Sequence, residues 1–357
     1  MMSLLERWVK KYFSDQEGII LALLLLLGFM VVIFFGEMLA PVLASVVIAY
    51  LLDDLAAVME RYGIQRRWAV VSVFMLFISF MLLILFGLVP LLSQQIVQLF
   101  QELPAMIGKG QKLLMQVPQS YPQFITEEQI REVMVGIRAD LAAKGEGLLS
   151  FSLASITTLF TGIVYLVLLP VLVFFFLKDK SQILEWVSGY LPKERGVTIR
   201  VWKEMDRQIG NYVRGKLTEI VIVGLVSWLA FSLMGLNFAS LLAALVGLSV
   251  IVPYVGAVVV TVPVLVIGYF QWGYSDLFIT LAVVYLVIQA LDGNVLVPLL
   301  FSEAVNLHPV AIIVAIVVFG GFWGFWGVFF AIPLATLVKA VIDAWPSLSD
   351  ENMAATG

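Results

Sequence analysis

Between Gln289 and Pro298 the sequence places a carboxylate, two amides, a glycine and a proline inside a long apolar run. The carboxylate belongs to Asp292; Gln289 lies one helical turn before it, and Asn294 follows Gly293. A charged Asp at the centre of a membrane-spanning helix costs about 2.5 to 3.5 kcal/mol, so such a residue is expected to face a protein interior or a water-filled path. Asp292 is therefore predicted to bind a cation, a proton or the hydroxyl of a polar solute. The structural alternative is a hydrogen bond between helices.

Further candidates for a substrate or ion pathway lie where a membrane helix would be interrupted or would enter the membrane. They are Pro253, Tyr254, Gly256, Gly321, Gly324, His308, Asn211 and Arg214. Amide groups freed at Gly or Pro breaks suit oxygen-rich solutes. Each candidate also has a structural interpretation: a tight turn at 253–256, a helix start at His308, and pairing of Arg214 with Glu219 or a lipid phosphate.

The composition predicts an all-α polytopic membrane protein. Of 357 residues, 62% are hydrophobic and 13% charged, whereas soluble domains carry about 25% charged residues. A net charge of -4 argues against a nucleic-acid binder, which would show a basic excess. The chain has no Cys and one His, and it lacks a His-Glu-x-x-His motif and a P-loop. No enzyme activity, cofactor or metal is therefore expected.

Apolar length predicts about six full spans, because the hydrocarbon core is about 30 Å thick and needs about 20 helical residues. They are 18–36, 38–52, 68–92, 151–177, 217–235 and 276–300. Cytoplasmic loops carry the excess of Lys and Arg, and segment 178–216 has nine of them against five in 93–150. With the basic residues before 18 and between 61 and 67 also inside, both termini are predicted to be cytoplasmic.

These spans divide the chain into six predicted regions. They are three N-terminal helices (1–92), an extracytoplasmic amphipathic helical arm (93–150), a span (151–177), a cytoplasmic amphipathic basic segment (178–216), an inverted-repeat transport region (217–342) and a tail (343–357).

Two apolar tracts in the transport region have the wrong length for one span. The first, 238–269, is interrupted at Pro253 to Gly256, and the second, 308–342, at Gly320 to Gly327. Each interruption leaves arms that are short or marginal for crossing, which favours re-entrant helical hairpins; one long kinked helix per tract is the alternative. The two tracts resemble each other at an offset of about 70 residues, and each follows one full span of opposite direction. Such an inverted repeat points to a transporter site near the membrane midplane.

Several ordered motifs resemble the autoinducer-2 exporter family. They are Asn211–Gly215, Pro253–Gly256, Asp292–Asn294 with Pro298, Asn306–Pro309 and Ala331–Ala335. The resemblance covers nearly the whole chain and is strongest from Arg207 onward. It departs from the family at Asp292, where many relatives have Glu.

The resemblance implies a permease of the bacterial inner membrane that assembles as a homopentamer. It further implies that two hairpins hold a small polar, sugar-like solute and move in an elevator-like manner. Sodium or proton exchange, a passive channel-like path and a scaffold role remain as alternatives, with solute, lipid and possible coupling ions as partners. A scaffold alone gives no reason for the carboxylate of Asp292.

Overall fold

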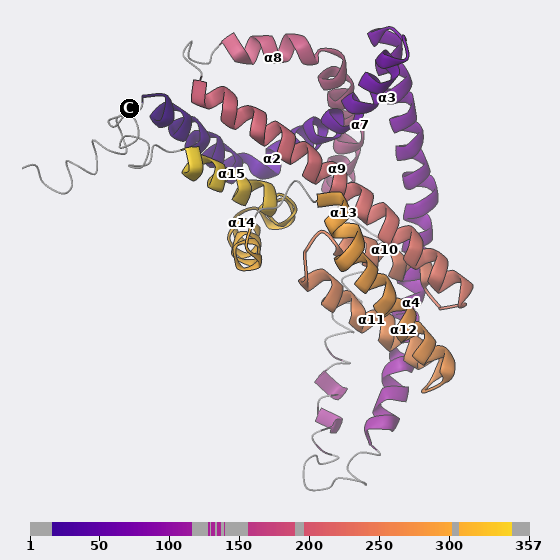
Figure 1. Cartoon of the computed structure of the whole chain (residues 1–357). Helices are drawn as coiled ribbons and strands as arrows, with labels where there is room; N and C mark the ends of the chain where they lie inside the picture. Colours follow the sequence, from indigo (N-terminus) through magenta and orange to yellow (C-terminus); the bar gives the residue numbers. More distant parts are fainter. Residues whose placement is uncertain are drawn as a thin grey trace, which may run out of the picture. The chain divides into compact units, whose positions relative to one another are not determined.

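The computed structural model describes residues 16–115, 128, 130–132, 134–136, 139, 156–189, 196–301 and 307–344. Within these ranges the chain is helical and has no strand. The elements are α2 (Gln16–Arg61), α3 (Arg66–Leu83), the π-helical turn η1 (Ile84–Leu88), α4 (Val89–Leu114), α7 (Ile156–Lys178), α8 (Lys180–Gly189), α9 (Gly196–Leu233), α10 (Ala239–Ser249), α11 (Val255–Trp272), α12 (Asp276–Leu291), the π-helical turn η2 (Asp292–Leu296), α13 (Val297–Phe301), α14 (Pro309–Phe329) and α15 (Ala331–Ala344) (Figure 1).

Six helical segments among the described residues are long and apolar enough to cross a membrane. They are Met38–Arg61, Arg66–Lys112, Asp206–Leu233, Val255–Trp272, Asp276–Phe301 and Pro309–Phe329. The prediction of an all-α, multi-pass membrane protein is thereby confirmed. The candidate spans differ in part from the predicted ones, since α11 and α14 also satisfy the criteria.

Helix α2 corrects the predicted N-terminal region. The two spans expected at 18–36 and 38–52 form one uninterrupted helix of 46 residues, which is about 69 Å long at 1.5 Å per residue. Gly36 and Pro41 lie near the expected boundary, but neither ends the helix. One glycine inside a helix costs about 1 kcal/mol and one proline about 3 kcal/mol. The predicted orientation required two crossings before Arg61, so α2 removes the premise that placed the two basic clusters on one side.

Two helices extend beyond the predicted span boundaries. Residue 92 lies inside α4, which continues to Leu114, and residue 217 lies inside α9. The first part of the expected arm therefore continues the helix that begins at Arg66. Most of the remaining arm lies outside the described residues, as do the first fifteen residues and residues 345–357.

Contacts divide the chain into two compact units. One comprises 1–74, 169–219 and 293–357, and the other comprises 75–168 and 220–292. The second unit packs α10 against α4 and α11, and α11 against α12 (Figure 1). Its core includes Tyr285, whose hydroxyl lies 3.2 Å from Thr261 Oγ1. These contacts hold the first predicted tract in place.

Two glycines allow α9 and α10 to pack closely in this second unit. A Cβ added at Gly247 would lie 2.9 Å from the Ile220 carbonyl oxygen and 3.0 Å from Gly224 Cα. Small residues of this kind allow membrane helices to approach backbone to backbone. The close approach fixes α10, and with it the tip of the first tract.

The first unit contains α14 and α15, which pack against each other, and an aromatic cluster on α9. Tyr212 is buried, with ring centroids 5.7 Å from Phe301 and 6.3 Å from Phe329. Gly215 faces the same ring, since a Cβ there would lie 2.8 Å from Phe301 Cε1. The sequence Asn211–Gly215 thus contributes a packed aromatic contact as well as polar groups.

Candidate functional site

The first predicted hairpin is a pair of helices joined by a tight turn. Helix α10 ends at Ser249 and α11 begins at Val255. Tyr254, in the turn, has a positive φ of 63°. Gly256 is buried against the Ser249 carbonyl oxygen, and a Cβ at this position would overlap that oxygen. Beyond this turn α10 and α11 pack against each other.

The arms of this hairpin are unequal. Helix α10 has 11 residues and α11 has 18. The expectation that both arms are too short to cross is wrong for α11, which is a candidate span by length and composition.

The second predicted tract has a similar turn. Gly324 has φ 56° and ψ -130°, which are not helical values, so α14 is interrupted there. Gly327 lies against the Phe319 carbonyl oxygen so closely that a Cβ would overlap it, and a Cβ on Gly320 would lie 2.8 Å from Val328 Cγ2. The chain is thus kinked at Gly324, directly after Trp323, and Gly321 near the kink is exposed.

The stretch that carries Asp292 does not break the helix. The Asp292 N–H donates to the Gln289 and Ile288 carbonyl oxygens at the end of α12. The backbone then continues through η2 and α13. Gly293 therefore lies in a π-helical turn, a feature that often occurs at functional sites.

Gln289 and Asp292 are three residues apart and share one helical face. Both are half-buried. Gln289 Nε2 is buried and has no hydrogen-bond partner among the described residues, although an unsatisfied buried donor costs about 1 to 3 kcal/mol. Asn294 and Pro298 are exposed. A buried amide donor therefore lies next to a carboxylate, and this pair could bind an oxygen-bearing ligand.

Asn211 and Arg214 are brought together at the start of the α9 span. Arg214 Nη2 donates to Asn211 Oδ1 at 3.0 Å, and Nη1 forms an ion pair with Asp54 on α2. The expected pairing of Arg214 with Glu219 is therefore wrong. Tyr50 adds a second contact between the two helices, since its hydroxyl donates to the Asp206 carbonyl oxygen at 3.1 Å.

Sequence reasoning missed a buried ion pair inside the α9 span. Lys216 Nζ lies 2.6 Å from Glu219 Oε2, and the two side chains are 5% and 3% exposed. The ammonium also lies 5.2 Å from the centroid of the Phe301 ring. The signal was present as opposite charges three residues apart in an apolar helix. It was missed because Lys216 was counted in the cytoplasmic basic segment.

A second charged group missed from the sequence is centred on Asp53 of α2. Arg66 Nη2 lies 2.5 Å from Oδ1, and Lys180 Nζ lies 2.6 Å from Oδ2. Arg66 also donates to the Leu177 carbonyl oxygen at 3.0 Å. This group joins the ends of α2 and α7 with the starts of α3 and α8.

His308 begins α14, and its side chain takes part in a local contact. Its Nδ1 accepts a hydrogen bond from the Val310 N–H at 3.3 Å, and Pro309 occupies the first helical turn. This arrangement is the helix-start role that the sequence left open.

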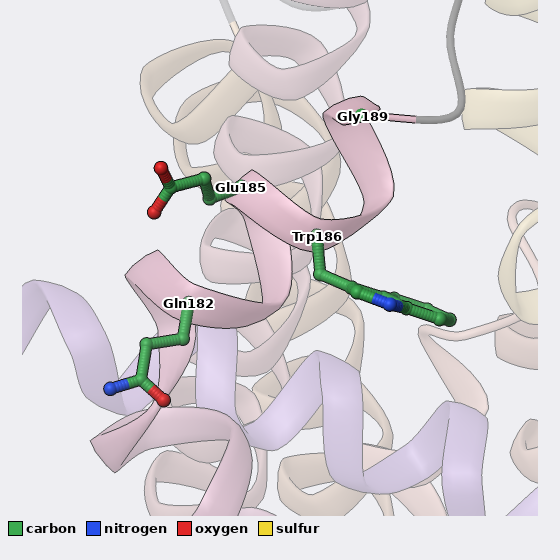
Figure 2. A pocket seen from close by; sticks show the side chains of 4 residues that line it. All are labelled: Gln182, Glu185, Trp186 and Gly189. Atoms are coloured by element: carbon green, nitrogen blue, oxygen red, sulfur yellow. The ribbon is translucent and has the colours of Figure 1, made fainter.

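One open hollow lies on α8 alone. Gln182, Glu185, Trp186 and Gly189 line it, and Figure 2 shows Gln182 and Glu185 projecting away from the Trp186 ring. Because all four residues come from one ten-residue helix and none is buried, the hollow does not enclose a solute.

The fold and the polar groups within its apolar helices define a multi-pass membrane protein with the features of a transporter. A model of the AI-2E family of transporters matches residues 20–347. The chain therefore belongs to the AI-2E transporter family, and it is a transporter rather than an enzyme.

Relatives support this membership over the length of the chain. A protein of Escherichia coli strain K12 named as a permease, PerM, is 48% identical over 346 residues, which cover 97% of this chain and 98% of PerM. YueF of Bacillus subtilis, named as a transport protein, is 24% identical over 318 residues, covering 87% and 84% of the two chains. A transport protein of Thermotoga maritima is 22% identical over 334 residues, covering 92% and 95%.

Proposed function

We propose that the protein moves a small polar solute of the autoinducer-2 type across the membrane by alternating access. The observation that carries the proposal is the shared geometry of the two tracts. In both, a residue with positive φ precedes a glycine that lies against a carbonyl oxygen of the preceding helix. Such compact turns keep backbone groups available near a tip, and paired Gly/Pro-interrupted segments are typical of transporter substrate sites. In the proposal these are re-entrant hairpins of an inverted repeat, and they move in an elevator-like manner.

Gln289 and Asp292 are the proposed solute contacts. The buried Gln289 amide has a donor to offer, and a carboxylate accepts hydrogen bonds from hydroxyl groups. Together they suit a polyhydroxylated solute. The resemblance further supports a homopentamer in the bacterial inner membrane. The cytoplasmic location of the C-terminus is predicted from the distribution of Lys and Arg, and both assignments belong to the proposal.

Replacing Asp292 by Asn is expected to lower autoinducer-2 flux into proteoliposomes at least about tenfold, equivalent to about 1.4 kcal/mol. The substitution keeps the side-chain size but removes the negative charge and one oxygen acceptor. Asp276→Asn is the matched control, because Asp276 is exposed at the first turn of the same helix. Equal flux from Asp292→Asn and the control would exclude Asp292 from transport.

Sodium or proton exchange is the second candidate function, and the buried pair of Lys216 and Glu219 favours it. Intramembrane ionisable residues often mark ion pathways. Flux of radioactive sodium or an internal pH change without autoinducer-2 would support exchange over solute export. Single-channel currents in planar bilayers would instead indicate a passive path.

The elevator-like movement predicts that the tip of the first hairpin is reached from both sides of the membrane in turn. The chain has no Cys, so Tyr254→Cys introduces a single reactive thiol at an exposed tip position. An impermeant maleimide is expected to label it from either side in separate experiments on oriented vesicles. Tyr274→Cys, exposed beyond the other end of α11, should be labelled from one side only. Labelling of Tyr254→Cys from a single side would contradict the movement.

A further inference from the structure

A cavity of about 460 Å³ lies within the first compact unit, apart from the proposed solute contacts. It is bounded by α2, the end of α7, α8 and the start of the α9 span. Its size falls within the roughly 300 to 1,000 Å³ typical of ligand sites. None of its lining residues is used by the proposed transport mechanism.

The lining of this cavity is divided by chemistry. Most of the wall is aliphatic or aromatic and includes Val46, Val47, Phe176, Ile183, Ile209 and Val213. The polar groups are Tyr50, Asp53, Lys180 and Asp206. A polar solute would leave the apolar part of this wall without an apolar partner. An amphiphile matches both the apolar wall and the polar groups.

The sequence places the cavity where the surrounding helices change from apolar to charged. From Met38 onward α2 carries no charged residue before Asp53, and α7 is apolar up to Lys178. In a membrane protein this change marks the boundary between hydrocarbon and headgroups. The cavity therefore lies at the depth where a phospholipid changes from acyl chains to a charged headgroup.

The charged groups select the kind of headgroup. The Lys180 ammonium has three donors, of which the structure uses one for Asp53 Oδ2, and its side chain is 44% exposed. Asp53 already has two cationic partners, Arg66 and Lys180. Asp206 is exposed and forms no ion pair among the described residues. The cavity thus offers one cation with free donors and one carboxylate that lacks a cation.

We propose that this cavity binds one zwitterionic phospholipid that carries a primary ammonium group. Its phosphate binds Lys180 and its ammonium binds Asp206. The cavity is too small for a whole phospholipid, so the acyl chains extend into the bilayer past Val46 and Leu184, which are 45% and 48% exposed. An anionic lipid would meet the carboxylate of Asp206 without a charge to pair with it.

The proposal is tested by photolabelling the full chain in vesicles that contain equal amounts of phosphatidylethanolamine and phosphatidylglycerol. A trace of one lipid carries a diazirine on its acyl chain, and the labelled peptides are mapped. We expect the phosphatidylethanolamine probe to label the segments around Val46 and Leu184 more strongly than the phosphatidylglycerol probe. Equal labelling by both probes, or no labelling of these segments, would overturn the proposal; the second result would mean that another chain or segment covers the cavity.

Two pairs of variants separate the cavity from the general lipid surface. Val46→Trp fills the cavity mouth and is expected to lower labelling about tenfold, which corresponds to about 1.4 kcal/mol of binding. Val58→Trp is its control, since Val58 is also 45% exposed on α2 but does not line the cavity. Equal losses from the two tryptophan variants would contradict the site.

Asp206→Asn tests the headgroup without changing side-chain volume, so it keeps the proposal falsifiable if Val46→Trp does not fold. It is expected to abolish the preference for phosphatidylethanolamine while total labelling by phosphatidylglycerol stays the same or rises. Glu185→Gln is the charge control, because Glu185 is exposed on α8 outside this cavity. A preserved preference in Asp206→Asn would overturn the assigned ammonium contact.

Discussion

Replacing Lys216 by Met is expected to destabilise the protein by about 3 to 5 kcal/mol, the usual cost of leaving one member of a buried ion pair without its partner charge. The Glu219 carboxylate is 3% exposed and would lose a cation at 2.6 Å. In the apolar setting of the α9 span, water cannot replace that cation. The measurement is denaturant unfolding of the purified protein in micelles, followed by circular dichroism or tryptophan fluorescence.

The double variant Lys216→Met with Glu219→Gln is expected to recover most of this loss, because it removes the buried charge together with its partner. Lys180→Met is the control for loss of an ammonium group. Its side chain is 44% exposed and its partner Asp53 retains Arg66, so the expected cost is at most about 1 kcal/mol. A double variant as unstable as Lys216→Met alone would show that the pair is not the source of the effect.

Gly327→Ala is the second substitution with a large expected effect. The added Cβ would overlap the Phe319 carbonyl oxygen and would lie 3.0 Å from the Gly320 nitrogen. Backbone atoms cannot move aside as a flexible side chain can, so the turn must open. Overpacking of this kind costs about 1 to 3 kcal/mol and sometimes more. Gly256→Ala is expected to act in the same way, because its Cβ would overlap the Ser249 carbonyl oxygen.

The matched control for this prediction is Gly321→Ala. Gly321 lies in the same tract, but a Cβ there meets no atom within 4 Å, and alanine favours helix over glycine by about 1 kcal/mol. It should leave stability unchanged or raise it. The yield of monodisperse protein after graded heating would rank the three variants. Equal stability of Gly327→Ala and Gly321→Ala would contradict the close approach.

The sequence predicted the all-helical, multi-pass class and the family because these depend on composition, apolar length and ordered motifs. The interruptions predicted at 253–256 and 320–327 each contain a glycine that lies against a carbonyl oxygen, but the sequence did not single out Gly327. What apolar length could not predict was helix continuity. By hydropathy, Gly36, Gly293 and the charged residues near 216 resemble the ends of helices. Keeping each of them inside a helix costs less free energy than breaking the helix in lipid, where every backbone group needs a hydrogen-bond partner.

The sequence also could not predict which charged side chains pair with each other. Arg214 could pair with the nearby Glu219 or with Asp54, which lies 160 residues away in the sequence. Spacing alone favoured the near residue, whereas helix packing brings the distant one into contact. The pair of Lys216 and Glu219 could have been found by searching apolar helices for opposite charges three residues apart.

The π-helical turn η2 adds one residue to a helical turn, so it changes which positions after it face the same side of the helix. Before the turn, the buried positions Leu281, Tyr285 and Ile288 follow the usual α-helical spacing, which would next place Val295 and Leu299 on the same side. Those two side chains are instead 55% and 74% exposed. The partly buried positions after the turn instead include Leu296 and Leu300, each one residue later than that spacing predicts. A pattern search that assumes one continuous α-helix therefore assigns the wrong face to every residue after Asp292, and shortening the turn by one residue would rotate that entire end by about 100°.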